Sequence, residues 1–413
     1  MTTKVVKADR LSTLSTSSIW EVMTPLANEH KAVNLGQGFP NLPPPPIVVK
    51  ELEAIVAATA QNPLQHQYCP VRGTGELVSA LQKLYSGRFQ REVLPSELGV
   101  ANGVTQGLNA LFEAFVNDGD EVIFIEPFYD AYITDVVTLG GVCKYVPLQP
   151  GPTSSAWKVS KEALKAAITP KTKFLLINTP QNIPGKAWDR EELEYIAQLA
   201  IEHDFVVVAD EVYMNLIYEK EHISIATLPG MWERTITLCS AGKTFSCTGW
   251  KIGWFVGAAP LVGPIAQVVC YQTFSICTPL QLAVARALKD DSVEQYYHTF
   301  REEYKKRLEF LTKALEACGI VPCAPDGGFF ITASISKIDP KYFLDEKDPN
   351  PKDWQFCLWL TKTIGVCALP LTAFCSDESK PLYENYVRFA YCKTDAELQL
   401  AAERLLKLKE YNL

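Results

Sequence analysis

The stretch KFLLINTPQNIPGKAWDREELEYIAQLAIEHDFVVVADEVY (173–213) decides the fold class. It begins and ends with runs of Val, Ile, Leu and Phe that stop at polar residues, which is typical of strands buried in a parallel sheet. Between these runs, DREELEYIAQLAIEH (189–203) predicts a helix with Asp189 as its N-cap. GDEVIFIEP (119–127) and RTITLCSAGK (234–243) repeat the strand pattern. The alternation predicts an α/β fold with a mostly parallel central sheet covered by helices on both faces.

The length of the chain predicts two domains, because 413 residues exceed what one hydrophobic core usually organises. We expect a large domain over residues 46–290 and a smaller α+β domain over 291–413. Residues 1–45 are expected to form an N-terminal arm and part of the small domain. The proline-rich LPPPPIV (42–48) marks the passage from the arm into the large domain. The small domain is predicted from helical patterns at 292–319 and 395–411 and from strand-like runs at 327–335 and 386–392.

Charge and composition exclude several classes of protein. Lys and Arg total 39 against 47 Asp and Glu, a formal charge of -8, which argues against nucleic acid or an anionic membrane as the main partner. Five scattered histidines and twelve cysteines without a CxxC motif predict free thiols and no metal site. Free thiols favour the reducing cytoplasm. The Ser/Thr-rich residues 1–19 leave a mitochondrial presequence as the alternative.

Residues 252–285 contain no charged side chain, which raises the question of a membrane span. Three prolines (Pro260, Pro264 and Pro279) and three glutamines interrupt the run, and a bilayer would penalise that polar content. We therefore expect a buried wall of an active site or a subunit contact here, and no membrane partner.

Three polar residues lie where such a sheet places its ligands, beyond the carboxyl ends of the strands: Asn182, Asp210 and Lys243. Lys243 follows a buried strand, where desolvation would lower the pKa of its amine toward the reactive free base. A solvated loop lysine is the alternative. A phosphate-binding P-loop is excluded, because position 237 is Thr where that motif needs glycine.

Asp210 ends the apolar run VVVAD, where an unpaired carboxylate would be costly. A cationic partner such as a pyridinium nitrogen would satisfy it and keep that ring protonated. A helix N-cap or a structural ion pair is the alternative. Tyr213 and Asn182 are candidates to reach the phenolic oxygen of the same ring, with ordinary packing and a turn as their alternatives.

Seven motifs spread over nearly the whole chain resemble those of the fold-type I aminotransferases of the aspartate aminotransferase superfamily, in the same order. Within that superfamily, the likeness is to the group of kynurenine aminotransferase, glutamine transaminase K and cysteine-S-conjugate β-lyase. The motifs are VNLGQGFPNLPPP (33–45), QYCPVRGTGEL (67–77), GDEVIFIEPFYDAY (119–132), NTPQNIPGK (178–186), ADEVYMNLIY (209–218), SAGKTFSCTGWKIGW (240–254) and VRFAYCK (387–393).

The resemblance implies pyridoxal 5′-phosphate as the cofactor and a role for each matching residue. Lys243 would hold the cofactor as an imine and, once released, carry a proton between the substrate Cα and C4′ of the cofactor. Asp210 would pair with the pyridinium nitrogen. Tyr213 and Asn182 would hydrogen-bond the 3′ oxygen, and Tyr129 would stack on the ring.

The resemblance also implies how the 5′-phosphate is bound. Ser240 and Lys251 would contact it, together with the neighbouring subunit's Tyr68, which makes the protein a homodimer with shared active sites. Backbone N–H groups at the start of a helix would complete a site suited to a dianion. They belong to Gly103, Val104 and Thr105.

Arg388 lies inside the strand-like YVRFAYC (386–392), where an arginine is expensive to bury without an anion. Its planar fork matches the α-carboxylate of an amino acid. The backbone N–H of Gly36 would face the same carboxylate. Trp20 resembles the family's aromatic wall for bulky substrate side chains, and a packing tryptophan is the alternative.

The expected reaction transfers the amino group of an L-amino acid (kynurenine, aromatic or glutamine-like) to a 2-oxo acid such as 2-oxoglutarate. Cysteine-S-conjugate β-lyase activity at the same site and a catalytically silent regulatory homologue that binds pyridoxal phosphate are the alternatives. Two departures from the family pattern bear on specificity. Asn182 is followed by Ile183-Pro184-Gly185 where the family usually reads N-P-x-G. Ile276-Cys277-Thr278 precede Pro279 where many kynurenine-type members carry aromatic or histidine side chains.

Overall fold

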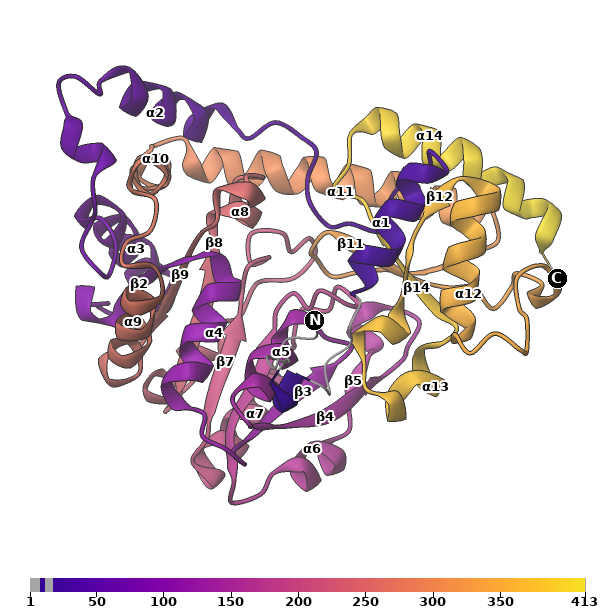
Figure 1. The fold of residues 1–413 in the computed structure, drawn as a ribbon, viewed down its shortest axis with the longest axis horizontal. Coiled ribbons are helices and arrows are strands. Elements are labelled where there is room, and N and C mark those ends of the chain that lie inside the picture. Colours follow the sequence, from indigo (N-terminus) through magenta and orange to yellow (C-terminus); the bar gives the residue numbers. More distant parts are fainter. Residues whose placement is uncertain (1–7, 12–17, 413) are drawn as a thin grey trace, which may run out of the picture.

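The computed structural model describes residues 8–11 and 18–412, built around an eight-stranded sheet (Figure 1). The central strands β8, β7, β6, β3 and β4 are parallel, whereas β9 runs antiparallel to both of its neighbours and β5 antiparallel to β4. From edge to edge the order is β2 (Leu98–Asn102), β9 (Ile252–Gly257), β8 (Thr235–Ser240), β7 (Val206–Asp210), β6 (Thr172–Asn178), β3 (Glu121–Glu126), β4 (Val142–Gln149) and β5 (Lys158–Val159).

The mostly parallel sheet predicted from the sequence is confirmed, and the four predicted strands are β3, β6, β7 and β8. One boundary differs: β8 ends at Ser240, and Lys243 lies in the short helix α8 (Ala241–Thr244). The predicted helix after Asp189 is α7 (Arg190–His203), with Asp189 as its N-cap.

Helices cover both faces of this sheet. Successive side chains of a strand point to opposite faces, and those of β3 enter two separate hydrophobic cores. Ile123 and Ile125 pack in the core that includes α7, whereas Val122 and Phe124 pack in the core that includes α4 (Gly103–Phe115). The other helices are α2 (Pro46–Ala57), α3 (Gly75–Phe89), α5 (Ala131–Thr138), α6 (Lys161–Ala167), α9 (Ala259–Thr273), α10 (Thr278–Lys289) and α13 (Lys380–Tyr383).

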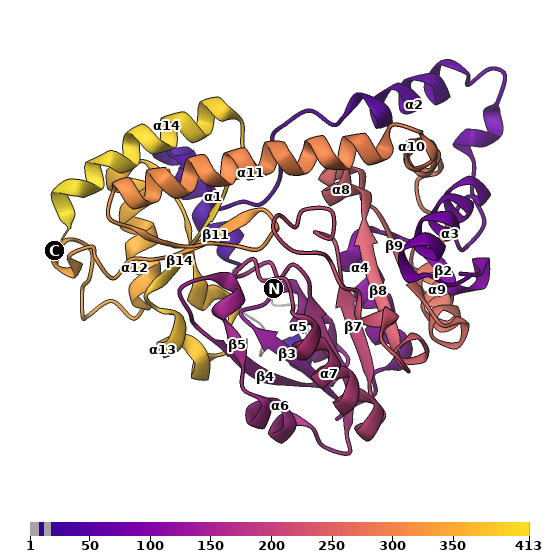
Figure 2. The same cartoon turned by 180° about the vertical axis from the view of Figure 1, so that it is seen from behind.

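A second, four-stranded antiparallel sheet lies beside the first. Its order is β10 (Val321–Cys323), β11 (Phe330–Ser334), β14 (Tyr386–Ala390) and β13 (Leu369–Pro370). Both views show the long helix α11 (Val293–Ala317) running from the neighbourhood of α10 to this sheet, beside α14 (Asp395–Leu405) (Figures 1 and 2). Helix α12 (Lys352–Trp359) completes this part of the molecule.

The N-terminal segment joins the C-terminal part of the chain. After α1 (Ile19–Glu29), the strand β1 (Val33–Asn34) pairs in parallel with β12 (Val366–Cys367). This pairing supports the division that we propose: a large domain over 46–290, and a small domain over 291–413 to which residues 1–45 contribute. The residues 1–7 and 12–17, which belong to the presequence alternative, lie outside the described residues.

The uncharged run 252–285 forms β9, α9 and the first half of α10. Most of its apolar side chains are buried, with Tyr271 and Phe274 among the exceptions. Among the helices that the structure describes, none combines the length and the apolar character that crossing a membrane requires.

Candidate active site

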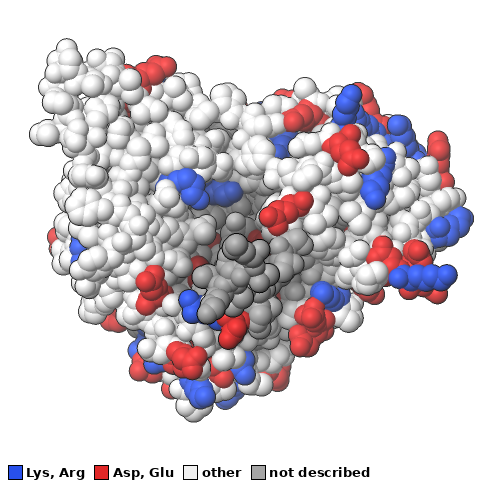
Figure 3. Space-filling view, in the orientation of Figure 1, with Lys and Arg blue, Asp and Glu red and all other residues white. Residues whose placement is uncertain are grey.

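A cavity of about 400 Å³ lies beyond the carboxyl ends of β6, β7 and β8, and the face of the molecule in Figure 3 is hollowed near its centre. Of the residues predicted to form the site, all but Gly36 and Tyr68 line this cavity. The lining includes Trp20, Gly103, Val104, Thr105, Tyr129, Asn182, Asp210, Tyr213, Ser240, Lys243, Lys251 and Arg388.

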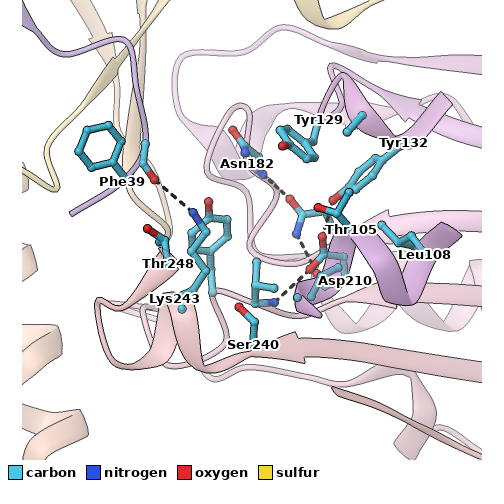
Figure 4. A pocket seen from close by; sticks show the side chains of 18 of the residues that line it. Phe39, Thr105, Leu108, Tyr129, Tyr132, Asn182, Asp210, Ser240, Lys243 and Thr248 are labelled. Carbon is cyan, nitrogen blue, oxygen red and sulfur yellow. Dashed lines mark hydrogen bonds between the residues drawn. The ribbon is translucent and has the colours of Figure 1, made fainter. Parts of the chain in front are cut away.

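Lys243 reaches into the cavity from α8 (Figure 4). Its Nζ donates to the backbone carbonyl of Gly38 at 3.1 Å and lies 5.7 Å from the ring centroid of Tyr213. Burial lowers the pKa of this amine from 10.5 to about 8. Near neutral pH, a larger share of this side chain is therefore the free, nucleophilic amine than for an exposed lysine.

Asp210 presents a buried carboxylate at the end of β7. Tyr132 Oη donates to its Oδ2 at 2.5 Å, and the backbone N–H of Val212 donates to its Oδ1 at 3.3 Å. Burial raises the pKa of Asp210 to about 6, although both hydrogen bonds oppose the shift. A cation bound beside this carboxylate would lower its pKa again and stabilise its negative charge.

A chain of three hydrogen bonds connects Asp210 with Arg388. Asn178, the last residue of β6, donates Nδ2 to the backbone carbonyl of Asp210 at 2.8 Å and accepts the N–H of Asn182 at 2.6 Å. Oδ1 of Asn182 accepts from Nη1 of Arg388 at 2.7 Å. Since a guanidinium only donates, Asn182 turns its oxygen to the arginine and keeps Nδ2 as a free donor. The order Ile183-Pro184-Gly185 therefore leaves Asn182 in the cavity lining with a donor available.

Arg388, in the middle of β14, is 1% exposed and lines the cavity. Its hydrogen bonds go to uncharged oxygens, those of Asn182 and the carbonyl of Gly36 (3.0 Å), and its Nε has no partner. Burial lowers its pKa to about 10, yet the guanidinium remains charged at neutral pH. A buried cation held by neutral acceptors is suited to bind an anionic group.

The loop at Gly36 forms a local turn in the structure. Its backbone N–H, which we predict to face the substrate carboxylate, donates to Oδ1 of Asn34 at 3.0 Å. The N–H of Gln37 donates to the same oxygen at 3.2 Å, which turns the loop. Gly36 also contributes its carbonyl to Arg388.

The start of α4 and Lys251 lie together and are suited to bind an anion. The N–H groups of the first helical residues lie at the positive end of the helix dipole. Lys251 has a left-handed backbone (φ 56°), and a Cβ on Gly103 would lie only 3.1 Å from its Nζ. The ammonium therefore stands over the first residue of the helix, while Ser240 lines the cavity from the end of β8.

Two of the aromatic side chains in the lining come from segments near the start of α5 and from α1. Tyr129 precedes α5 and packs edge-on against Tyr132, with the ring centroids 5.6 Å apart. Trp20, from α1, donates Nε1 to Oδ2 of Asp130 at 3.0 Å. The N-terminal helix is thereby tied to the segment that carries Tyr129.

Tyr68 lies on an exposed apolar face. Its side chain is 78% exposed and packs edge-on against Phe274, which is 61% exposed. Leu64 and Tyr271 are also largely exposed, at 80% and 83%. Figure 3 shows that the upper left of the molecule, over α2, α3 and α10, is nearly free of charged side chains.

Two residues that touch the predicted ones were missed from the sequence. Tyr132 holds Asp210, and Asn178 links Asp210 to Asn182. Asn178 could have been found by the pattern that identified Asp210, because it too is a polar residue at the carboxyl end of a buried strand. The two residues are paired across β6 and β7. No group of side chains suited to a metal ion is found in 8–11 and 18–412.

The chain belongs to the class I and II aminotransferases, whose family model matches residues 30–405. It is 40% identical to the kynurenine–oxoglutarate transaminase of Dictyostelium discoideum, over 95% of this chain and 94% of that one. It is 39% identical to kynurenine–oxoglutarate transaminase 3 of Homo sapiens, over 98% and 91%. The crystal structure of Bna3p from Saccharomyces cerevisiae matches with a TM-score of 0.93 at 33% identity, covering 99% of this chain and 100% of that chain.

The predicted family, fold and enzyme class are thus confirmed: the protein is an aminotransferase with pyridoxal 5′-phosphate as its cofactor. The cavity fits this cofactor chemically. The desolvated amine of Lys243 suits the aldehyde of the cofactor. The buried carboxylate of Asp210 suits the ring nitrogen. The ammonium of Lys251, beside the start of α4, suits the phosphate.

Proposed function

We propose that this aminotransferase moves the amino group of an L-amino acid, of the kynurenine, aromatic or glutamine type, to a 2-oxo acid such as 2-oxoglutarate. The observation that carries the proposal is the shared cavity: the charged guanidinium of Arg388 lines the same space as the amine of Lys243 and the carboxylate of Asp210. The names of the similar proteins from Dictyostelium discoideum and Homo sapiens support kynurenine and oxoglutarate as substrates.

Pyridoxal phosphate, when bound, supplies an aldehyde that condenses with amines and a ring that accepts electrons from the substrate carbon. Asp210 would place its negative charge against the ring nitrogen, and Tyr132 keeps that carboxylate in position. Tyr213 and Asn182 would donate to the phenolic oxygen, and Tyr129 would stack on the ring. Ser240, Lys251 and the N–H groups of Gly103, Val104 and Thr105 line the cavity and would bind the phosphate.

Lys243 is the residue that would move the proton. Its Nζ would take the proton from the substrate Cα and return it at C4′ of the cofactor, a role that suits an amine whose pKa of about 8 lies near the working pH. Arg388 binds the substrate carboxylate through its planar fork and so fixes which bonds of Cα face this amine. Trp20, with its indole held by Asp130, forms the wall beside the substrate side chain.

A donor panel tests the proposal. The holoenzyme is mixed with 2-oxoglutarate and L-kynurenine, L-phenylalanine or L-glutamine, and the glutamate formed is measured by mass spectrometry. At least one donor is expected to give glutamate far above the level seen with Lys243→Ala. Glutamate at that background level with every donor would refute the proposed substrates.

Borohydride reduction tests separately where the cofactor is attached, because its adduct is expected on Lys243 alone.

We further propose a homodimer in which Tyr68 reaches the phosphate site of its partner. Large exposed apolar side chains support this, since they are typical of an interface: Tyr68 and Phe274 pack against each other, and Leu64 and Tyr271 are also largely exposed. Tyr68→Phe is expected to raise the dissociation constant of pyridoxal phosphate about tenfold, through loss of a charge-assisted hydrogen bond. Ultracentrifugation should show a dimer for both proteins, and a fully active monomer would contradict the shared site.

The twelve cysteines are free thiols. This supports a reducing compartment, and we place the enzyme in the cytoplasm.

A further inference from the structure

Two fully buried carboxylates hold the two ends of one short segment, residues 372–379. Asp353, in α12, accepts the backbone N–H of Thr372 on Oδ2 and the Thr372 hydroxyl on Oδ1, each at 2.8 Å. Glu126, the last residue of β3, accepts the backbone N–H of Ser376 and the hydroxyl of Ser379. The segment is therefore tied to the large sheet through one acid and to a helix of the small domain through the other.

These two acids are costly to bury. Both are 0% exposed, and burial raises the pKa of Glu126 and raises that of Asp353 to about 7. Such a cost is offset only when the carboxylate oxygens are well hydrogen-bonded. Apart from the backbone N–H groups of Asp353 itself and of Trp354 (3.0 Å), the donors to the two side chains come from the segment. Most of the hydrogen bonds that offset the burial of these two acids thus come from eight residues of chain, 372–379.

Phe374 stands in the middle of this segment, at the end of the short helix Leu371–Phe374. Its carbonyl accepts the N–H of Phe128 at 2.9 Å, a further tie to the large domain. Its buried ring lies 4.8 Å from Cζ of Arg388, and its centroid is 6.4 Å from that of Trp20. The segment therefore places an aromatic ring against the guanidinium.

Ring packing matters for Arg388 because its hydrogen bonds do not fix it fully. Nη1 and Nη2 each have a single acceptor, and Nε has none. Phe330 lies 3.9 Å from Cζ and Phe374 4.8 Å. A planar guanidinium packs favourably on aromatic faces, so these rings set the tilt of its plane.

We propose that Phe374 is a positioning residue for the substrate carboxylate, acting through Arg388, and that Asp353 and Glu126 hold it in place from the two domains. The inference deepens the proposed function and rests on it, because it takes Arg388 as the residue that binds the carboxylate. If the segment is released, the ring withdraws and the guanidinium tilts. Carboxylate binding then weakens, while Lys243 and Asp210 keep their places.

The pair Thr372→Val and Thr372→Ser tests this in the holoenzyme. Valine keeps the shape of the side chain but removes the hydroxyl that donates to Asp353, whereas serine keeps this hydroxyl. For Thr372→Val, we expect KM for the amino donor to rise about tenfold, from the loss of one hydrogen bond to a charged group, with kcat changed less than about threefold. Calorimetry with 3-phenylpropanoate, an unreactive carboxylate, is expected to show the same rise in Kd. Thr372→Ser should restore both values.

Thr361→Val is the matched control. Thr361 is equally buried, and its hydroxyl donates to the backbone of Cys357 at 2.8 Å, without contact to the segment. Its KM and Kd should stay at the wild-type values. An unchanged Kd in Thr372→Val, or an equal rise in Thr361→Val, would overturn the inference.

Two further variants keep the test decisive. If Thr372→Val does not fold, Phe374→Leu replaces it, with the same expected rise in Kd and the same overturning result if Kd is unchanged. Arg388→Ala is measured alongside. If Arg388→Ala weakens 3-phenylpropanoate binding but the segment variants do not, only the positioning inference fails. If Arg388→Ala also has no effect, the proposed carboxylate site itself is wrong.

Discussion

Lys243→Ala is expected to lower kcat for transamination by at least about 10⁴-fold. General acid–base catalysis by a positioned group contributes about 10²–10⁴-fold, and this variant also loses the nucleophile that holds the aldehyde. Steady-state kinetics with the best donor measures the loss, and the absorbance spectrum should lose the pH-sensitive band of the bound cofactor. The remaining cofactor contacts, at Asp210 and Lys251 among others, are intact, so the protein should still bind pyridoxal phosphate with reduced affinity.

Lys165→Ala is the control, because this lysine lies exposed on α6, outside the cavity. It should behave as the wild type. Turnover by Lys243→Ala within tenfold of the wild type would contradict the role of the amine.

The pH dependence of Lys243 gives a second readout of the same prediction. Because burial lowers its pKa from 10.5 to about 8, the amine in the cofactor-free protein loses its proton on raising the pH through 8, well before an unfolded lysine does. Labelling with an amine-directed reagent, followed by peptide mass spectrometry, should therefore reach half its maximum near pH 8. In urea, the same peptide should react only at higher pH.

Arg388→Ala is expected to raise KM for amino donors by about 10²–10⁴-fold. Two charge-assisted hydrogen bonds are worth about 1.5–3 kcal/mol each, and about 1.4 kcal/mol corresponds to a factor of ten. Arg388→Lys should fall between the wild type and Arg388→Ala, because it keeps the charge and loses the planar fork. The spectrum of the bound cofactor should be unchanged in both variants.

Phenethylamine separates the carboxylate role from a general disturbance of the site. It lacks the carboxylate, so the wild type and Arg388→Ala should process it at similar rates. A KM for amino acids that is the same in both proteins would exclude Arg388 as the carboxylate site.

The sequence predicted the parts of the site that depend on strand ends. Asp210 ends a buried parallel strand, Asn182 and Lys243 follow two others, and parallel strands bring their carboxyl ends to one edge of the sheet. The motif resemblance then added residues from distant segments, such as Trp20 and Arg388, which also line the cavity. Both kinds of prediction use information that is local in the sequence or shared across a family.

Side-chain contacts between distant segments were not predictable in this way. Tyr132 meets Asp210 across 78 positions of chain, and the pattern around each residue alone does not indicate the pairing. The turn at Gly36 was not predicted either: the Asn34 side chain accepts the N–H of Gly36 and forms a local turn of the kind that Asn favours. The exposure of Tyr68 was not predictable either, because it depends on how the helices around it pack.

The hydrogen-bonded path from Arg388 through Asn182 and Asn178 to Asp210 sets the distance between Arg388 and Asp210. Each link is a direct bond between buried or half-buried groups, and two of the links involve the backbone, so the span between its ends is fixed by the fold. In the function that we propose, Arg388 at one end binds the acid group of the ligand, and Asp210 at the other end binds the cofactor ring. We therefore expect compounds with an extra carbon between amine and acid to be poor substrates, whatever side chain they carry.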